Sequence, residues 1–418
     1  MVNLIVDIDI ILGSYSVARG KSGVFVVADN VIKRLAERPD LKISFSCTAP
    51  MFNFIKLLKK DDFYKKFEIV DYWKTTKIDD YFISKLNSSK ISKKIAKTYL
   101  SLRQKIYIKK QHFNRNDSFA YLSILFKPHA FLLKNIPNVT KFTILHDAVH
   151  ALFPQWSPGM NNGKYWFAQL IKTLNGNDFY FTVSQNTKKD FLKLVPSMNS
   201  NHIFVNYIAA DPKKFYPCND EKKILNTLNK YKIPSQNYIL SLCTLDYRKN
   251  ILFAVKNFIA FIKKNKIDNL YLVLAGGQRD DFMEKLEESF KEYTDYRNKI
   301  IITGYIADED LAPLYSAAIF FVYPTIYEGF GLPPLEAMQC GCPVITSNNS
   351  SLPEVCGDSA ILIDCYNDNQ LQGAYFELYT NKEKRLNLSK KGLERCKLFN
   401  WEKTATFIGD TIMNYAKK

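Results

Sequence analysis

Short apolar runs recur along this chain of 418 residues, and helix-like or loop segments separate nearly all of them. A continuous apolar run of strand length is typical of a strand buried on both faces of a parallel sheet. The runs form two series: Asn3–Leu12, Ile43–Cys47, Phe119–Leu125, Lys141–Leu145, Phe179–Val183 and Ile203–Val205, then Tyr238–Cys243, Leu270–Ala275, Lys299–Thr303, Ile319–Tyr323, Pro343–Thr346 and Ala360–Ile363. This alternation predicts an α/β fold with two doubly wound, Rossmann-like domains.

A lysine- and asparagine-rich stretch, residues 219–237, lies between the two series, and we interpret it as a connecting helix and linker. The first domain is predicted to span residues 1–207 and the second residues 208–400. Doubly wound sheets bind ligands at the carboxyl ends of their strands. Two such domains that face one another therefore predict a site in an interdomain cleft.

The composition excludes several classes of protein. Hydrophobic residues make up 47% of the chain and charged residues 24%, which excludes disorder as the main state. No stretch approaches the roughly 18 apolar residues that a membrane-spanning helix requires. The first apolar run contains Asp7 and Asp9 and follows no basic leader, which argues against a secretion signal and predicts a cytoplasmic protein. The eight cysteines show no paired metal spacing, so we expect reduced thiols and no metal site.

The charge of the chain is strongly positive. Its 58 basic and 41 acidic residues give a net charge of +17, which favours anionic partners. Ten of the basic residues and no acidic residue lie between Lys85 and Arg115. This segment can form an amphipathic helix whose apolar side chains fall near one face: Ile91, Ile95, Leu102 and Ile106. Such a helix suits an anionic membrane surface, and a solvated helix packed on its own domain is an equal alternative.

The same charge motivates the main alternative function, a basic nucleic-acid-binding protein without catalytic activity. No zinc finger, aromatic RNA-binding signature or recognition-helix pattern accompanies the basic segment. We therefore expect no nucleic-acid partner.

The segment with the most chemical information comprises residues 323–338, where a predicted strand ends and a helix is expected to begin at Pro333 or Pro334. Gly329 and Gly331 let backbone N–H groups approach a ligand closely, and the start of a helix attracts anions. The segment therefore predicts a cradle for phosphate.

Two glutamates frame this cradle, Glu328 before it and Glu336 eight residues later, and their carboxylates can accept hydrogen bonds from hydroxyl groups. Within the run Glu-Gly-Phe-Gly-Leu-Pro…Glu-Ala, the pair resembles the signature of family 4 of the retaining glycosyltransferases, which have the GT-B fold. Further segments are similar to that family and follow its order: Ile144–Asp147, Thr182–Gln185, Ala209–Phe215, Leu242–Asn250, Ala275–Gly277, Gly304–Ile306, Gly341–Ile345 and Ser351–Val355.

The resemblance implies a retaining enzyme without metal or other cofactor. It would transfer a sugar from a nucleotide diphosphate sugar to a hydroxyl of a saccharide or lipid-linked saccharide, in bacterial surface polysaccharide or lipopolysaccharide synthesis. Glu328 would contact hydroxyls of the donor sugar, and Glu336 would contact the nucleotide ribose. Arg248 and Lys249 match the positions whose cations hold the donor diphosphate, and His146 matches a histidine that orients the sugar. Front-face internal return and a short-lived covalent adduct both stay open as routes to retention.

The resemblance also implies the remaining donor-binding positions. They are Gly23 in a glycine-rich loop after the first strand, and Gly304, Tyr305, Gly329, Phe330, Gly331 and Leu332 in the second domain. The last helix, at about residues 401–418, is expected to cross back onto the first domain.

Donor and location follow from the same resemblance. The run Leu-Asp-Tyr-Arg-Lys-Asn at residues 245–250 resembles mannosyltransferase-like members, which favours GDP-mannose as the donor over a UDP-sugar. Enzymes of this kind often extend lipid-linked saccharides. Attachment of the basic segment to the inner face of the cell membrane is compatible with such an acceptor.

Overall fold

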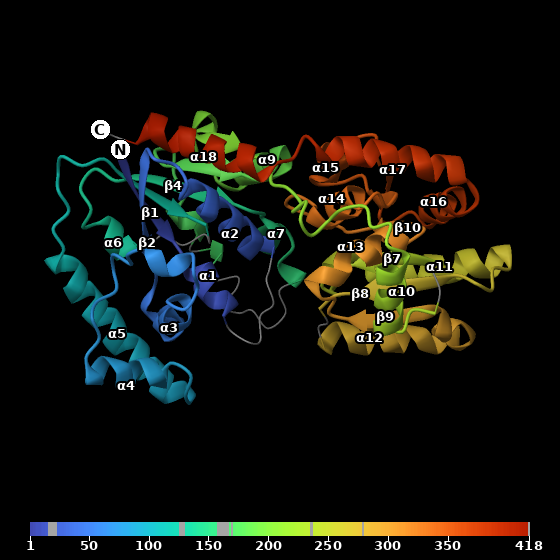
Figure 1. Ribbon diagram of the computed structural model, residues 1–418, viewed down its shortest axis with the longest axis horizontal. Helices are drawn as coiled ribbons and strands as arrows, with labels where there is room; N and C mark the ends of the chain where they lie inside the picture. Colours follow the sequence, from blue (N-terminus) through green and yellow to red (C-terminus); the bar gives the residue numbers. More distant parts are fainter. Residues whose placement is uncertain are drawn as a thin grey trace.

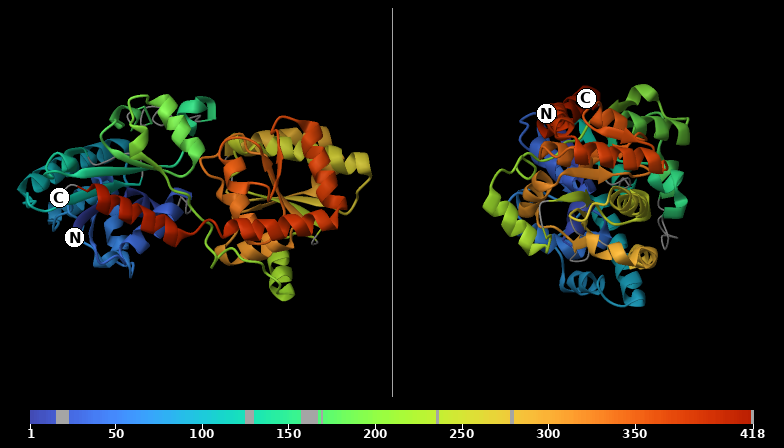
Figure 2. Two further views of the ribbon diagram at one scale, coloured as in Figure 1. Left: turned by 90° about the horizontal axis from the view of Figure 1, so that it is seen from above. Right: turned by 90° about the vertical axis from the view of Figure 1, so that its right-hand side faces the viewer.

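The structure is a computed structural model that describes residues 1–15, 23–124, 130–156, 167–168, 170–234, 237–277 and 280–416. In this part of the chain, two α/β domains lie next to one another (Figure 1, Figure 2). Each is built on a parallel sheet of six strands, with helices on both faces of the sheet. The predicted α/β fold with two doubly wound domains is confirmed.

The first sheet has the strand order β2-β1-β3-β4-β5-β6. Its strands are β1 (Val2–Asp7), β2 (Leu41–Ser46), β3 (Phe119–Ser123), β4 (Thr140–Leu145), β5 (Phe179–Thr182) and β6 (Ile203–Val205). The helices around it are α1 (Asp9–Ser14), α2 (Gly23–Leu35), α3 (Ile55–Leu58), α4 (Lys77–Lys85), α5 (Lys90–Lys110), α6 (Ala130–Leu133), α7 (Val149–Leu152) and α9 (Gln185–Leu194). Leu125, which we included in the third predicted strand, lies outside the described residues.

The second sheet has the strand order β12-β11-β10-β7-β8-β9. Its strands are β7 (Tyr238–Leu242), β8 (Tyr271–Ala275), β9 (Ile300–Gly304), β10 (Phe320–Tyr323), β11 (Val344–Ser347) and β12 (Ile361–Ile363). The helices of this half of the chain are α10 (Glu221–Lys230), α11 (Ile251–Asn265), α12 (Asp280–Phe290), α13 (Asp308–Ala317), α14 (Leu332–Gln339), α15 (Leu352–Cys356), α16 (Asp368–Thr380), α17 (Lys382–Cys396) and α18 (Trp401–Tyr415).

The first apolar run differs from the prediction of one strand over Asn3–Leu12. β1 ends at Asp7, and α1 begins at Asp9. The Asp7 carboxylate accepts a hydrogen bond from the Asp9 amide at 2.9 Å, which stabilises the change of direction between them. A continuous apolar run is compatible with a buried strand and with a buried helix, so the two aspartates were the only local mark of the boundary.

α18 packs against α2 of the first domain, so the end of the chain returns to the domain where it began (Figure 1). Arg38 Nη1 donates to Asp410 Oδ1 at 2.8 Å, and Thr404 Oγ1 donates to the carbonyl of Tyr207 at 2.7 Å. These contacts tie α18 to both the body and the last loop of the first domain. Residues 417 and 418 lie outside the described residues.

The basic segment forms the predicted helix, α5, on the side of the first domain away from the second (Figure 1). One face of α5 is buried against its own domain: Ala96, Leu100, Gln104 and Ile108. The four side chains that we placed on an apolar face are 50% to 75% exposed: Ile91, Ile95, Leu102 and Ile106. α5 therefore packs on its own domain and also presents a second, exposed apolar stripe.

Candidate functional site

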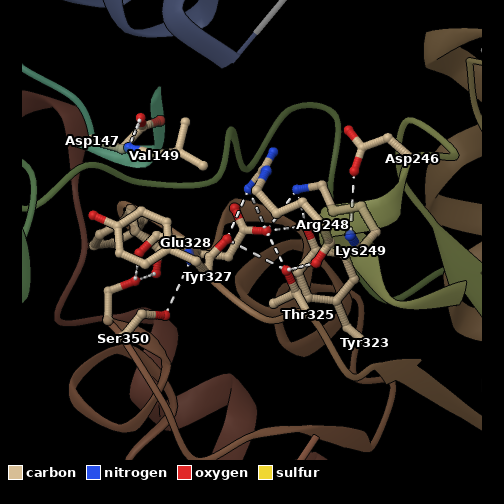
Figure 3. Close-up of polar contacts among 12 residues, drawn as sticks. Asp147, Val149, Asp246, Arg248, Lys249, Tyr323, Thr325, Tyr327, Glu328 and Ser350 are labelled. Carbon is tan, nitrogen blue, oxygen red and sulfur yellow. Dashed lines mark hydrogen bonds and ion pairs between the residues drawn. The ribbon is translucent and has the colours of Figure 1, made fainter. Parts of the chain in front are cut away.

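Glu328 lies at the centre of a polar cluster beyond the carboxyl ends of β7 and β10 (Figure 3). Because β7 and β10 are parallel neighbours, the loops that follow them emerge at the same edge of the sheet. Lys249 Nζ donates to Glu328 Oε1 at 2.6 Å, and Arg248 Nη1 lies 2.9 Å from the same oxygen. The hydroxyls of Tyr323 and Thr325 lie 2.8 and 2.9 Å from it. One carboxylate oxygen is thus surrounded by two cations and two hydroxyl groups.

The two cations are held by a short 3₁₀ turn that follows β7. Asp246 caps this turn, because its Oδ1 accepts the backbone amide of Lys249 at 3.2 Å. Asn250 ends the turn in the left-handed region, with a φ of 55°. The carbonyl of Arg248 accepts the amide of Ile326 at 2.9 Å, which joins the turn to the loop after β10. Backbone hydrogen bonds therefore hold the turn that carries both cations against the loop of Glu328.

The charges in this cluster favour an ionised Glu328. Glu328 and Lys249 are only 8% and 7% exposed. Burial by itself raises the pKa of the Glu328 carboxyl, but Arg248 and Lys249 outweigh burial and lower that pKa to about 2. Burial and the charge of Glu328 raise the pKa of Tyr323, so this phenol stays protonated and donates to the carboxylate. The cluster can therefore bind hydroxyl groups through Glu328 and an anion through the two cations.

Residues 329–331 of the second domain, called the glycine-rich loop from here on, lead directly into α14. Gly331 precedes the helix with a φ of 109°, which a side chain would strain, and the helix begins at Leu332, one residue before the predicted start. Pro333 and Pro334 have no N–H group, so the first turn offers an anion little more than the amides of Gly331 and Leu332. The helix start therefore has few free backbone donors, and Arg248 and Lys249 supply most of the positive charge beside it.

Glu336 contacts a different set of side chains from Glu328. It lies on α14, where the hydroxyl of Tyr315 from α13 is 3.4 Å from its Oε2. Burial raises the pKa of Glu336 to about 7, so near neutral pH this carboxyl both accepts and donates hydrogen bonds. Its contact with a nucleotide ribose stays a prediction.

Three further predicted donor-binding residues differ in exposure. Phe330 is buried, with its ring 5.6 Å from that of Phe399 and 6.2 Å from that of Tyr207, so only its backbone is available to a ligand. Gly304 ends β9 with a φ of 72°, and Tyr305 beside it is 66% exposed. Tyr305 is therefore accessible to a ligand, whereas Phe330 belongs to the packing between loops.

First-domain residues lie against the same loop. His146 follows β4 and is buried, with Nε2 2.9 Å from the carbonyl of Ile124. A carbonyl only accepts, so Nε2 carries the proton, and burial lowers the pKa of the ring, which is therefore neutral at physiological pH. Gly23, which we placed in a glycine-rich loop, is the first residue of α2, and a Cβ atom on it would lie 3.9 Å from Leu332, so the start of α2 meets the start of α14 across the two domains. Residues 20–22 of that loop lie outside the described residues.

Sequence reasoning missed several residues of the site. The hydroxyl of Tyr323 contacts both Lys249 and Glu328. Its position as the last residue of the predicted strand before the glycine-rich loop could have identified it. Tyr327 donates to Asp190 of the first domain at 2.7 Å, a contact for which the sequence contains no signal because the two residues lie far apart in the chain.

A second group of carboxyls lies at the carboxyl ends of β1 and β2. Asp71 is fully buried and accepts hydrogen bonds from Ser46 Oγ at 2.7 Å and from the Cys47 amide at 3.1 Å. Burial raises the pKa of Asp71 to about 7 in spite of these bonds. Burial and the charge of Asp9 raise the pKa of Asp7 well above its usual range. The native first domain therefore favours protonated carboxyls at this edge of the sheet.

Asp71 should make the free energy of unfolding fall as the pH rises from about 4 to 7. Its pKa is about 7 in the folded chain, against 3.8 for an ordinary aspartate, so the folded state binds more protons in this window. Between pH 5 and pH 7 the contribution lost is about 2 kcal/mol, because each unit of pH well below the folded pKa contributes about 1.4 kcal/mol and the unit nearest that pKa contributes less. Asp71→Asn should flatten this slope, which urea unfolding of both proteins at pH 5 and pH 8 measures. Equal slopes for the two proteins would contradict the protonated state of Asp71.

Comparisons with known proteins identify the family of this chain. Residues 225–395 match the model of the family described as "Glycosyl transferases group 1". O-antigen chain mannosyltransferase B of Escherichia coli is 31% identical over 266 residues, which make up 63% of this chain and 68% of that protein. The serotype-specific mannosyltransferase WbdA of Escherichia coli is 27% identical over 272 residues, 65% of this chain but only 33% of that protein. The solved structure of sucrose-phosphate synthase from Thermosynechococcus elongatus has the same fold over 99% of both chains, with a TM-score of 0.67 at 18% identity. The chain therefore belongs to the group 1 glycosyltransferases and has their GT-B fold.

Proposed function

We propose that this enzyme is a retaining, metal-independent glycosyltransferase of bacterial surface polysaccharide synthesis. Its donor is GDP-mannose, with UDP-sugars as the next candidates, and its acceptor is a hydroxyl of a saccharide or lipid-linked saccharide. The observation that carries the proposal is the convergence of Arg248 and Lys249 on Glu328 beside the glycine-rich loop. The similarity to two proteins named as mannosyltransferases supports the choice of donor.

The chemistry of transfer fits these residues. The bond between the anomeric carbon and the diphosphate oxygen breaks, and negative charge collects on the departing nucleoside diphosphate. Arg248 and Lys249 stabilise that charge from fixed positions, the role a divalent metal plays in other enzymes. Both cations are paired with Glu328 in the structure, so a bound diphosphate takes over part of this pairing and leaves Glu328 to the sugar hydroxyls.

The acceptor oxygen forms the new bond to the anomeric carbon. In a front-face reaction its proton passes to the departing phosphate oxygen, so no protein base is required. Glu328 is ionised and cannot serve as an acid, but a carboxylate also suits the covalent route. The charge stabilisation by Arg248 and Lys249 serves both routes equally.

A panel of nucleotide sugars tests the donor and the need for metal. In EDTA, GDP-mannose should stabilise the purified protein by about 2.7 kcal/mol at a hundred times its Kd, because side chains supply the cations. Transfer or hydrolysis should follow the same order of donors, and NMR of the product should show a retained anomeric configuration. Stabilisation that needs added Mg²⁺, or an inverted product, would contradict the proposal.

We further propose that α5 attaches the enzyme to the inner face of the cell membrane. Exposed apolar side chains alternate along α5 with lysines, and no acidic residue lies between Lys85 and Arg115. Apolar contact combined with attraction to anionic lipids is the usual basis of such attachment. Among the described residues, no helix is long and apolar enough to cross a membrane. The attachment we propose is peripheral.

Replacing Lys93, Lys94 and Lys97 with glutamine should weaken binding to anionic vesicles by at least about tenfold, since each basic residue near the surface contributes about 1 kcal/mol. A control variant with Lys222, Lys263 and Lys264 replaced removes the same charge from exposed positions on α10 and α11. Co-sedimentation with phosphatidylglycerol vesicles should separate the two variants, and activity on a soluble acceptor should not. Equal vesicle binding by both variants would favour the alternative, a helix that serves only its own domain.

A further inference from the structure

The loop that carries Glu328 is held from the first domain as well as from its own. Ser184 Oγ donates to the carbonyl of Gly329 at 2.6 Å, and Thr187 Oγ1 lies 3.1 Å from the same oxygen. Both hydroxyls are fully buried, at the start of α9. A Cβ atom on Gly329 would lie 2.1 Å from the carbonyl oxygen of His146, so this approach requires glycine. The first domain therefore binds the residue directly after Glu328 by hydrogen bonds and close packing.

The residue directly before Glu328 is held in the same way. The hydroxyl of Tyr327 donates to Asp190 Oδ2 on α9 at 2.7 Å and accepts the backbone amide of Ala148 at 3.3 Å. The ring of Tyr327 lies 5.4 Å from that of Phe153, also in the first domain. Glu328 is thus flanked on both sides by residues that the first domain binds.

A third contact keeps α9 in place against the second domain. Glu354 of α15 accepts the backbone amides of Gln185 and Asn186, at 2.9 and 3.0 Å, at the N-terminus of α9. Its Oε2 also lies 3.2 Å from the hydroxyl of Tyr207. A carboxylate at a helix N-terminus is favoured by the unpaired amides and by the helix dipole. α9 is therefore bound to the second domain at its start and along its first two turns.

We propose that Ser184, Thr187 and Asp190 are positioning residues, which set the place of Glu328 through Tyr327 and Gly329. This inference rests on the proposed function, because it assigns Glu328 to the reaction. Glu328 is then held correctly only while the two domains are together. Arg248 and Lys249 both belong to the second domain, where Arg248 Nη1 donates to the backbone carbonyl of Tyr327 at 2.9 Å. Substitutions of the Tyr327 hydroxyl or of Asp190 leave that carbonyl in the chain, so we expect both cations still to bind the nucleoside diphosphate.

Hydrogen exchange tests the contacts of Ser184, Thr187 and Asp190 with the loop of Glu328, called the clamp below, without any assay of activity. Asp190→Ala and Tyr327→Phe should each speed exchange of the amides in residues 326–332 by about tenfold, because local opening governs exchange. Tyr231→Phe is a matched control, since the hydroxyl of Tyr231 donates to Asp310 at 2.9 Å and accepts the Ala307 amide at 3.0 Å, within the second domain. Unchanged exchange of the loop in both test variants would overturn the clamp.

Kinetics tests the positioning role. Each test variant should lower kcat by about tenfold, as expected for a misplaced catalytic group, and leave the affinity for GDP within about twofold. The double variant should resemble either single variant, because both changes remove the same hydrogen bond, that between Tyr327 and Asp190. A double variant in which the two losses multiply, or a GDP affinity that falls with kcat, would overturn the role. If no nucleotide sugar is a substrate, the proposed function fails, and the exchange experiment still decides the clamp.

Discussion

Glu328→Gln should lower kcat by about a hundredfold or more, the scale of one lost contact in the transition state. The substitution keeps the shape of the side chain but removes the charge that we propose faces the sugar. It also removes the partner of Arg248 and Lys249, which pair with Glu328 at 2.9 and 2.6 Å. Because the two cations are then free for phosphate, the affinity for GDP should stay equal or rise. A loss of turnover without a loss of GDP affinity is the signature of this residue.

The control for this variant is Asp310→Asn. Asp310 is 8% exposed, like Glu328, and pairs with Lys230 at 2.6 Å away from the site. Glu328→Gln leaves the buried Lys249 and the partly buried Arg248 without their partner, and Asp310→Asn removes the charge of a buried carboxylate that Lys230 and Tyr231 contact, so both should lower the melting temperature. Only Glu328→Gln should affect turnover. Near-normal turnover, or a loss of GDP affinity that parallels the loss of turnover, would remove Glu328 from the chemistry.

The strands were predictable because each is a short apolar run between polar segments. Ile203–Val205 was predicted without error, and most other strands within one or two residues at each end. The prediction failed at α1, where apolar residues continue across a strand and a helix, and only Asp7 and Asp9 mark the boundary. Periodicity cannot separate two buried elements that adjoin each other.

The apolar face of α5 shows a second limit. Two rows of side chains run along different faces of this helix, one buried and one exposed. The sequence pattern identified the exposed row. The buried row contains Gln104, whose Nε2 donates to the carbonyl of Cys47 at 2.8 Å. A buried glutamine looks polar in the sequence, and only its tertiary partner explains its place in the core.

The residues alone indicated each motif of the candidate site, and the resemblance to a known family placed the motifs together. Glu328 and the glycine-rich loop form one motif, and Arg248 and Lys249 form another, so their meeting follows from the neighbouring positions of β7 and β10. The direct pairing of Glu328 with both cations was not predicted, because the sequence analysis assigned the carboxylate to the sugar and the cations to the diphosphate. The contact between Tyr327 and Asp190 depends on how two domains meet, which no local pattern encodes.

Lys249→Met should weaken GDP binding by about 2 to 4 kcal/mol, or about thirtyfold to a thousandfold, as expected when one partner of a buried charge pair is lost. Lys249 is 7% exposed, so its ammonium group is screened little by water. Methionine keeps much of the volume of the side chain, and Arg248 still pairs with Glu328 at 2.9 Å, so the fold should persist. Calorimetric titration with GDP measures the loss.

A comparison of GDP with GMP shows whether Lys249 acts on the diphosphate. GMP lacks the second phosphate, so its affinity should fall much less than that of GDP, and the ratio of the two affinities should shrink. Lys230→Met is the control, because Lys230 also pairs with a second-domain carboxylate, Asp310, at 2.6 Å, but away from Glu328. Equal losses for GDP and GMP would mean that Lys249 supports the site only through its structure. A selective loss for GDP would place the ammonium group on the leaving phosphate, where the charge of the transition state develops.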